Sequence, residues 1–251
     1  TLAALAATGQ PTKHEPFHPM PDGFRHVVWG DLDQMRAAID PSVSAILVEP
    51  VQGEGGVNPA SEEYFRGIRE LCDERGLLMI VDEVQTGFAR TGKWFGFQHF
   101  GVVPDVVTMA KAMGNGMPVG ACWARRDVAA VLQPGDHGST YSGTAIATAA
   151  VRAVINEMRA MDAPAVSAAK GARLRAGLEA IPGVKQVRGL GLLLAAELGE
   201  GADAKAVYTA LLANGLVTNA VTGTALRLAP PITVSDAEID EALSLIREVL
   251  S

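Results

Sequence analysis

Short apolar runs that alternate with amphipathic stretches constrain the fold of this chain more than any other feature. Four such runs lie at residues 44–48 (SAILV), 77–81 (LLMIV), 105–109 (DVVTM) and 119–124 (VGACWA). Each run has the length of a strand, and the stretch that begins at Ser61 (SEEY) has the capping-box pattern of a helix start. Strands that are apolar throughout are typical of a mostly parallel sheet covered on both faces. The sequence therefore predicts an α/β fold.

The pattern changes after an alanine-rich helix predicted for residues 144–161. The remaining segments predict helices at 164–180, 202–214 and from Ser235 onward, with strands at 184–187, 192–197 and 226–228. This mixture indicates a smaller α+β domain. We expect two domains, residues 1–161 and residues 162–251, and an irregular, proline-rich crossing at residues 11–30.

Composition excludes several classes of protein. The chain has 251 residues with a net charge of −7, so no basic surface is expected for nucleic acid. No run of about 18 apolar residues predicts a membrane span. The two cysteines, Cys72 and Cys122, fit reduced thiols, and the five histidines lack metal-ligand spacing. The start of the chain does not resemble a signal peptide, so we expect a cytoplasmic protein without a metal, nucleic-acid or membrane partner.

Charged residues follow three of the predicted strands. Glu49, Asp82 and Lys111 stand at the carboxyl ends of the first three apolar runs, with glycine-rich loops beside two of them. One such charge usually marks only the exit of the chain from the core. Ligands of parallel α/β sheets bind at this edge, so the three charges together favour a site.

Lys111 and Asp82 suggest a specific chemistry. A lone lysine is most often a solvated surface group, but a lysine held against apolar walls is a nucleophilic amine that forms Schiff bases. A carboxylate at a neighbouring strand end can hold a heteroaromatic nitrogen protonated. An amine and an acid in this arrangement are what pyridoxal phosphate requires of a protein.

Two competing motifs are weaker. Residues 87–93 (GFARTGK) match the first part of a phosphate-binding loop, but Trp94 stands where that motif needs serine or threonine. The glycines at 53–56 and 189–191 lack the third glycine and the following helix of a dinucleotide fingerprint. Neither motif predicts a nucleotide site.

Five segments taken together resemble the class III pyridoxal-phosphate aminotransferases, which have the fold of type I pyridoxal-phosphate transferases. The segments, in chain order, are EPVQGEGGV (49–57), VDEVQTGFARTGKWF (81–95), PDVVTMAKAMGNGMPVGA (104–121), GDHGSTYSGT (135–144) and ALRLAPPITVS (225–235). Family members are longer on the N-terminal side. The resemblance thus implies that residues 1–161 are the later part of a cofactor-binding large domain, that residues 162–251 are the small C-terminal domain, and that the chain is truncated.

The resemblance also implies which residues bind the cofactor. Lys111 would form the Schiff base and move the proton at the substrate carbon, and Asp82 would pair with the pyridinium nitrogen. Gln85 would lie beside the phenolic oxygen of the ring. Glu83 and Val84 would form the rest of the pocket wall.

Further residues would bind phosphate and substrate by the same resemblance. Thr140 would bind the cofactor phosphate of the neighbouring subunit of a homodimer, and Ser139 would touch substrate across the same boundary. Arg227 would bind a substrate carboxylate, and Glu54 would neutralise Arg227 when that carboxylate is absent. After residue 141 the family usually has Gly-Gly-Asn-Pro, whereas this chain has Ser-Gly-Thr-Ala, so packing near the subunit boundary is expected to differ.

The implied reaction passes the ω-amino group of N2-acetylornithine to 2-oxoglutarate, giving glutamate and a semialdehyde, as in arginine biosynthesis. Ornithine, 4-aminobutyrate and succinylornithine remain alternative donors. A different alternative is an inactive fragment that binds cofactor or partners weakly, because missing strands would leave an exposed sheet edge.

Overall fold

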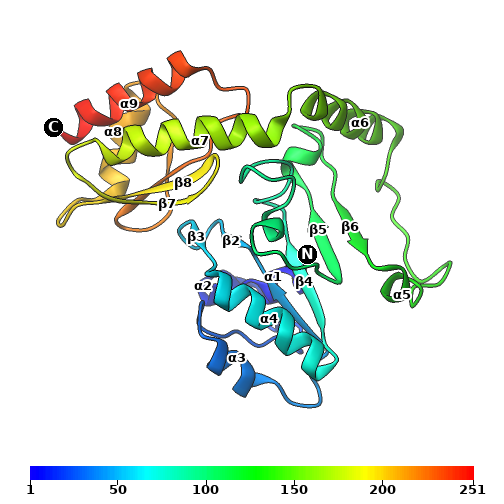
Figure 1. Ribbon diagram of the computed structural model, residues 1–251. Coiled ribbons are helices and arrows are strands. Elements are labelled where there is room, and N and C mark those ends of the chain that lie inside the picture. The colour runs from blue at the N-terminus through cyan, green and yellow to red at the C-terminus, as the bar shows by residue number, and fades with distance from the viewer.

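Two separate four-stranded sheets organise the computed structural model, which describes all residues from 1 to 251 (Figure 1). The first sheet has the order β1-β4-β5-β6. Its strands are β1 (Ala45–Val48), β4 (Leu78–Asp82), β5 (Val106–Met109) and β6 (Ala121–Ala124). β1, β4 and β5 are parallel, as the sequence predicts, whereas β6 is antiparallel to β5. The connection from β5 to β6, residues 110–120, contains only the short turn η3 (Lys111–Met113), whereas a parallel return requires a crossover of about a dozen residues or more, usually with a helix.

Helix α4 (Glu62–Arg75) covers one face of this sheet. The Ser61 hydroxyl accepts a hydrogen bond from the Tyr64 amide at its start, and Gly76 ends it in the left-handed conformation with φ of 68°. The apolar side of the helix packs against alternate residues of β4. The core members that make this contact include Phe65, Ile68, Leu71, Met79 and Val81.

The opposite face of the first sheet is less well covered. The Leu47 side chain is 48% exposed, and Ile80, its register partner on β4, is only half-buried. The expectation that both faces are covered is therefore wrong for the residues of this chain. An apolar strand shows what the sheet has to bury, but it does not show which polypeptide supplies the cover.

The second sheet is antiparallel and has the order β7-β8-β10-β9. Its strands are β7 (Val184–Leu190), β8 (Leu193–Leu198), β9 (Asn219–Ala220) and β10 (Ala225–Leu228). Three helices cover one face of it, namely α7 (Ala163–Glu179), α8 (Ala204–Ala213) and α9 (Asp236–Leu250). The Ser235 and Glu238 side chains form the predicted capping box at the start of α9. Helix α7 connects this unit to α6 (Ala145–Ala160) in the first one (Figure 1).

The remaining elements are short. They are α1 (Leu2–Ala7), α2 (Pro11–His14), η1 (Glu15–Phe17), α3 (Leu32–Ala38), β2 (Val51–Gln52), β3 (Asn58–Pro59), η2 (Gly96–His99) and α5 (Arg126–Ala129). The crossing at residues 11–30 is largely irregular, as predicted, but it begins with the helical turns α2 and η1. None of the helices combines the length and the apolar character that crossing a membrane would need.

The β2–β3 hairpin connects the two units. Val51 and Val57 from the ends of this hairpin pack with Leu193 and Ala195 of β8 in a small, fully buried cluster. Because the hairpin follows directly from the carboxyl end of β1, this contact brings the second sheet to the site edge of the first one.

Candidate active site

The carboxyl ends of β1, β4 and β5 bring three charged residues to one edge of the sheet. The parallel register aligns Val48 with Val81 and aligns Asp82 with Thr108. Glu49 follows β1, Asp82 is the last residue of β4, and Lys111 lies two residues beyond the end of β5. The sequence-based prediction that these residues share an edge is confirmed by this register.

Asp82 lies on the face of the sheet opposite α4. Side chains alternate along a strand, and Val81 packs toward α4, so Asp82 lies on the other face with Ile80. One oxygen of its carboxylate, Oδ1, accepts a hydrogen bond of 2.9 Å from the Val84 amide. This bond fixes the carboxylate at the strand end.

Lys111 has a backbone conformation that is uncommon for a residue with a side chain. Its φ is 46°, in the left-handed region, and its side chain is exposed at the start of η3. Such strained positions cluster at functional sites, because the surrounding structure has to impose them. The conformation makes Lys111 a strong candidate for a functional amine.

Glu49 is the most perturbed acid of this edge. Burial raises its pKa to about 6, and the Gly53 amide, which donates a hydrogen bond of 2.9 Å to Oε2, opposes that rise. The negative charges of Asp82 and Glu54 raise this pKa further, whereas the positive charge of Lys111 lowers it. Glu49, Glu54, Asp82 and Lys111 therefore lie close enough together for their charges to interact.

Glu54 and Arg227 form an ion pair across the two sheets. Arg227 Nη1 on β10 lies 2.7 Å from Glu54 Oε1, and the same nitrogen donates to the Gly53 carbonyl at 3.2 Å. Gln85 Nε2 donates to Glu54 Oε1 at 2.9 Å. The Arg227 hydrogen bond is the main cause that lowers the pKa of Glu54. The Arg227 side chain is only 14% exposed, whereas that of Glu54 is 53% exposed, so the acid has the greater freedom to move.

Glu83 differs from its neighbour Asp82. It is buried, and its carboxylate accepts hydrogen bonds from the Gly96 amide (2.9 Å), the Phe97 amide (2.8 Å) and the Thr86 hydroxyl. Burial raises its pKa. These bonds hold the loop that follows β4, and the Glu83 side chain is fully engaged inside that loop. Val84 contributes its backbone amide to Asp82.

Ser139 and Thr140 are not joined to this cluster. Both are exposed on the segment between α5 and α6, and neither makes a hydrogen bond to another residue of the site. The residues that follow, Tyr141 to Gly143, line a shallow hollow with residues 118–120. This chain alone therefore leaves the two hydroxyls facing solvent.

Sequence reasoning missed two arginines that shape the site. Arg188 on β7 donates Nε to the Gly56 carbonyl at 2.9 Å. Arg90 donates to the carbonyls of Leu192 (3.2 Å) and Pro230, which joins the loop after β4 to the β7–β8 turn and to the segment after β10. The only available indication was a charged residue within an otherwise apolar or glycine-rich segment.

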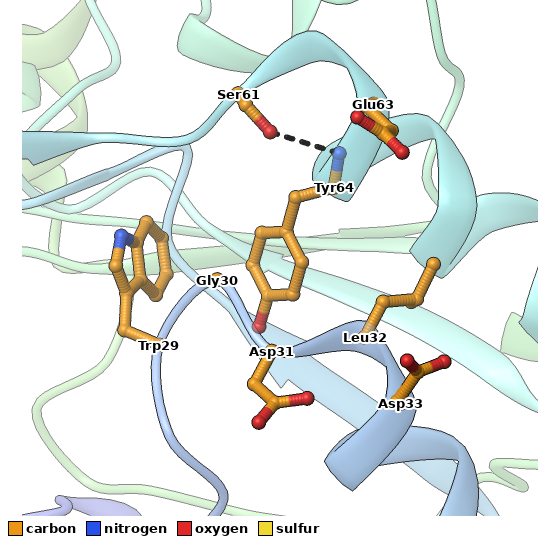
Figure 2. Close-up of a pocket in the computed structure, with 8 residues that line it drawn as sticks. All are labelled: Trp29, Gly30, Asp31, Leu32, Asp33, Ser61, Glu63 and Tyr64. Carbon is orange, nitrogen blue, oxygen red and sulfur yellow. Dashed lines mark hydrogen bonds between the residues drawn. The ribbon is translucent and has the colours of Figure 1, made fainter.

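A separate hollow of about 540 Å³ lies at the N-terminal ends of α3 and α4 (Figure 2). Trp29 and Tyr64 form its aromatic wall, with a ring separation of 5.5 Å, and Asp31, Asp33 and Glu63 lie at its rim. None of the predicted site residues lines it. We assign no function to this hollow, because it is open and has no group aimed at a ligand.

The residues of the strand edge fit the ring end of pyridoxal phosphate. The amine of Lys111 and the carboxylate of Asp82 are the two groups that its aldehyde and ring nitrogen need, and they follow adjacent parallel strands. Gly53 leaves space for the Gln85 side chain, since a Cβ there would lie 2.7 Å from it. The Thr140 hydroxyl expected for the phosphate lies on the exposed segment instead.

The fold as a whole is that of a type I pyridoxal-phosphate transferase, represented in part. The sequence pattern of the family described as aminotransferase class-III matches residues 1–250. The chain therefore belongs to the class III aminotransferases, a family that depends on pyridoxal phosphate.

Individual relatives agree with this membership. The chain is 44% identical to the acetylornithine aminotransferase of Caldanaerobacter subterraneus subsp. tengcongensis and 45% identical to that of Corynebacterium efficiens. The matches cover 100% of this chain but only 64% and 63% of those proteins. The crystal structure of the ornithine aminotransferase from Toxoplasma gondii superposes with a TM-score of 0.93 at 33% identity, covering 100% of this chain and 61% of that one. The chain thus spans less than two thirds of the length of its relatives.

Proposed function

We propose that this chain takes part in transamination, moving the ω-amino group of N2-acetylornithine to 2-oxoglutarate to give glutamate and a semialdehyde. The ion pair of Glu54 and Arg227 beside the edge with Asp82 and Lys111 carries the proposal, because it supplies a carboxylate site next to an amine. The names of the most similar curated relatives support acetylornithine as the donor.

Bound pyridoxal phosphate would supply an electron sink for the cleavage of bonds at the substrate carbon. In this proposal Lys111 Nζ attaches the cofactor and then holds and returns a proton at that carbon. Asp82 keeps the proton on the ring nitrogen, and its bond from the Val84 amide keeps it oriented. Gln85, which binds Glu54, would contact the ring oxygen.

Arg227 and Glu54 would let one pocket accept two kinds of substrate. A partly buried arginine without a partner is costly, so Glu54 neutralises Arg227 while an ω-amine binds. When 2-oxoglutarate binds, its carboxylate takes the place of the Glu54 carboxylate on the guanidinium. This exchange needs only the more exposed of the two side chains to move.

A cofactor titration tests the proposal directly. Pyridoxal phosphate added to the protein should produce the long-wavelength absorbance of a lysine-bound cofactor, and Lys111→Ala should abolish it. Lys93→Ala, which removes another exposed lysine, is the control and should keep the absorbance. If the absorbance persists in Lys111→Ala, Lys111 is not the attachment point; if the parent chain shows none, the chain as given is an inactive fragment.

Ornithine is the second candidate donor, because the ornithine aminotransferase of Toxoplasma gondii superposes along the whole chain. The two donors differ by an acetyl group on the α-nitrogen, which removes a positive charge. Initial rates with N2-acetylornithine, ornithine, succinylornithine and 4-aminobutyrate at equal concentrations distinguish the candidates. A preference for ornithine would replace the donor but leave the reaction class unchanged.

We also propose a homodimer in which the segment between α5 and α6 meets a second copy. Four apolar side chains around this segment are strongly exposed, namely Val131 (77%), Leu132 (69%), Tyr141 (84%) and Ile146 (67%). Burial against a partner would place Ser139 and Thr140 at the boundary, where they would serve the neighbouring site. Leu132→Asp should shift the protein toward monomer in sedimentation experiments, whereas the exposed Leu212→Asp on α8 should not.

The two main core clusters support a division of the chain into two domains, with the boundary between residues 102 and 174. One cluster lies entirely between Met35 and Val102, and the other lies between Leu174 and Ile246. We propose that residues 1–161 belong to the large, cofactor-binding domain and that residues 162–251 form the small domain.

A further inference from the structure

The loop that carries Glu54 is held at several backbone atoms. This loop, residues 52–58 (hereafter the Glu54 loop), leaves the edge of the first sheet and packs on β8 through Val57. Arg188 Nε binds the Gly56 carbonyl on one side of Glu54. Arg227 binds the Gly53 carbonyl on the other side.

Gly53 is bonded from both of its polar backbone atoms. Its amide donates to Glu49 Oε2 at 2.9 Å, and its carbonyl accepts from Arg227 Nη1 at 3.2 Å. A single peptide segment therefore connects the Glu49 carboxylate at the end of β1 to the guanidinium on β10. A Cβ on Gly53 would lie 2.7 Å from the Gln85 side chain, so this segment packs closely against Gln85.

We propose that Glu49 is a positioning residue that holds Gly53 in place, so that Arg227 keeps one fixed partner while Glu54 alone moves. The inference rests on the proposed function, because it concerns how Arg227 alternates between Glu54 and a substrate carboxylate. Without the Glu49 carboxylate, the Gly53 amide loses its acceptor and the Gly53 end of the loop becomes more mobile, while Arg188 and Val57 still hold its other end. The Gly53 carbonyl and the Glu54 carboxylate then leave Arg227 together.

The hydrogen bond to Gly53 also bears on the cost of placing an acid in a crowded negative region. Glu49 lies close enough to Asp82 and Glu54 for their charges to act on it, which is unfavourable for a carboxylate. Its hydrogen bond to the Gly53 amide offsets part of that cost. The bond needs an oxygen acceptor, not a charge, so glutamine at position 49 is expected to substitute.

Site-specific chemical modification tests the proposal without requiring catalysis. Phenylglyoxal reacts with arginine side chains, and peptide mapping by mass spectrometry gives the modification rate of Arg227 alone. In Glu49→Ala we expect Arg227 to react at least threefold faster than in the parent protein, while Glu49→Gln stays within 1.5-fold. Amide hydrogen exchange of the peptide that contains Gly53 should accelerate about tenfold in Glu49→Ala and little in Glu49→Gln.

Asp40→Ala is the matched control. Asp40 also accepts a backbone hydrogen bond, from the Ser42 amide at 2.8 Å, but it is exposed and remote from the site edge. Asp40→Ala should change neither the rate at which phenylglyoxal modifies Arg227 nor the amide hydrogen exchange of the peptide that contains Gly53. Unchanged Arg227 reactivity in a folded Glu49→Ala protein would overturn the proposal, and so would Glu49→Gln behaving like Glu49→Ala.

The proposed function fails in a different way. Loss of the cofactor absorbance in the parent chain, or its persistence in Lys111→Ala, counts against the transaminase assignment of these residues. Neither result changes the modification rate of Arg227 or the exchange rate of the Gly53 amide. Failure of the proposed function and failure of the Glu49 proposal can therefore be distinguished.

Discussion

At the scale of single residues, neighbouring acids of this chain have unlike tasks because their surroundings differ. Asp82 and Glu83 are adjacent in sequence, yet Asp82 stands at the sheet edge and Glu83 is buried among three hydrogen-bond donors. Glu49 is partly buried and shares the edge with Asp82, whereas Glu54 reaches out to a guanidinium. The side-chain environment decides which of these acids is available to a ligand.

Removal of the Glu54 carboxylate should change substrate preference. In Glu54→Ala, Arg227 loses its resident partner and is open to α-carboxylates at all times. We expect activity toward short α-amino acids to rise about tenfold relative to activity toward the ω-amine, which corresponds to about 1.4 kcal/mol. The test is to measure kcat/KM for short α-amino acids and for the ω-amine in the parent and in Glu54→Ala, in the active enzyme. An equal ratio of the two values in both proteins contradicts the exchange of partners at Arg227.

Glu49 should make stability depend on pH. The pKa of this acid rises from 4.5 to about 6 on folding, so the folded protein binds more protons than the unfolded chain between these values. Stability from this group is therefore greatest below about pH 4.5 and is lost as the pH rises through about 6, by about 2 kcal/mol in total. Glu49→Gln cannot ionise and should be more stable than the parent at pH 8, by up to that amount.

Urea unfolding of the parent and of Glu49→Gln between pH 5 and pH 8 measures this difference. The free energies of unfolding of the two proteins, plotted against pH, should approach each other as the pH falls. Glu241→Gln, which removes an exposed carboxylate of α9 in the second unit, is the control and should follow the parent curve. If the difference in free energy of unfolding between Glu49→Gln and the parent grows toward acid pH, burial does not raise the pKa of Glu49.

At the scale of elements, the site residues lie on loops and at strand ends, and the strands set the relative positions of these loops. The loop after β4 supplies Val84 and Gln85, and it is shaped from within by the Glu83 carboxylate. The Glu54 loop reaches the second sheet because the hairpin β2–β3 packs on β8. Both loops are positioned by buried polar contacts that leave few backbone groups free to rearrange.

Glu83→Ala should destabilise the protein by about 3 kcal/mol. The substitution leaves the Gly96 and Phe97 amides and the Thr86 hydroxyl without their acceptor in a buried place. Thermal unfolding should show a clear decrease of Tm, with a smaller decrease for Glu83→Gln, which keeps one acceptor oxygen. Glu62→Ala at the exposed start of α4 is the comparison, and an equal effect of both alanine variants would contradict the role of the Glu83 carboxylate.

At the scale of the whole molecule, the candidate site lies where two separately built units meet. The first sheet supplies Asp82 and Lys111, and the second supplies Arg227, while the Glu54 loop crosses between them. Arg90 fastens the same boundary with hydrogen bonds to the carbonyls of Leu192 and Pro230, and burial lowers the pKa of its guanidinium. The relative position of the two units is therefore part of the site.

Arg90→Met should weaken the connection between the units. The variant keeps much of the buried volume but leaves the two carbonyls without their donor. We expect calorimetric unfolding to broaden or to separate into two transitions, one for each core. Arg173→Met, which removes an exposed ion pair with Asp240 inside the second unit, should leave a single transition unless the parent already shows two. A single sharp transition in Arg90→Met, unchanged from the parent, would argue that the Arg90 side chain does not hold the two units together.

The sequence by itself determined the elements and the chemistry of the strand ends. Apolar runs of strand length gave β1, β4 and β5, side-chain caps at Ser61 and Ser235 gave the starts of α4 and α9, and parallel strands brought Glu49, Asp82 and Lys111 to one edge. These features are local, because period and capping depend on residues a few positions apart. The resemblance to the family, not the residue pattern, paired Glu54 with Arg227.

Only the tertiary structure decided the rest. It reversed β6, left one face of the first sheet less well covered, turned Glu83 inward and gave Arg90 and Arg188 their partners. The partners of the two arginines lie in distant segments of the chain, and the direction of β6 depends on the length of a connection. A hydrogen-bond partner more than a hundred residues away, such as the Gly56 carbonyl for Arg188, leaves no periodic trace in the sequence, and so only the folded chain reveals it.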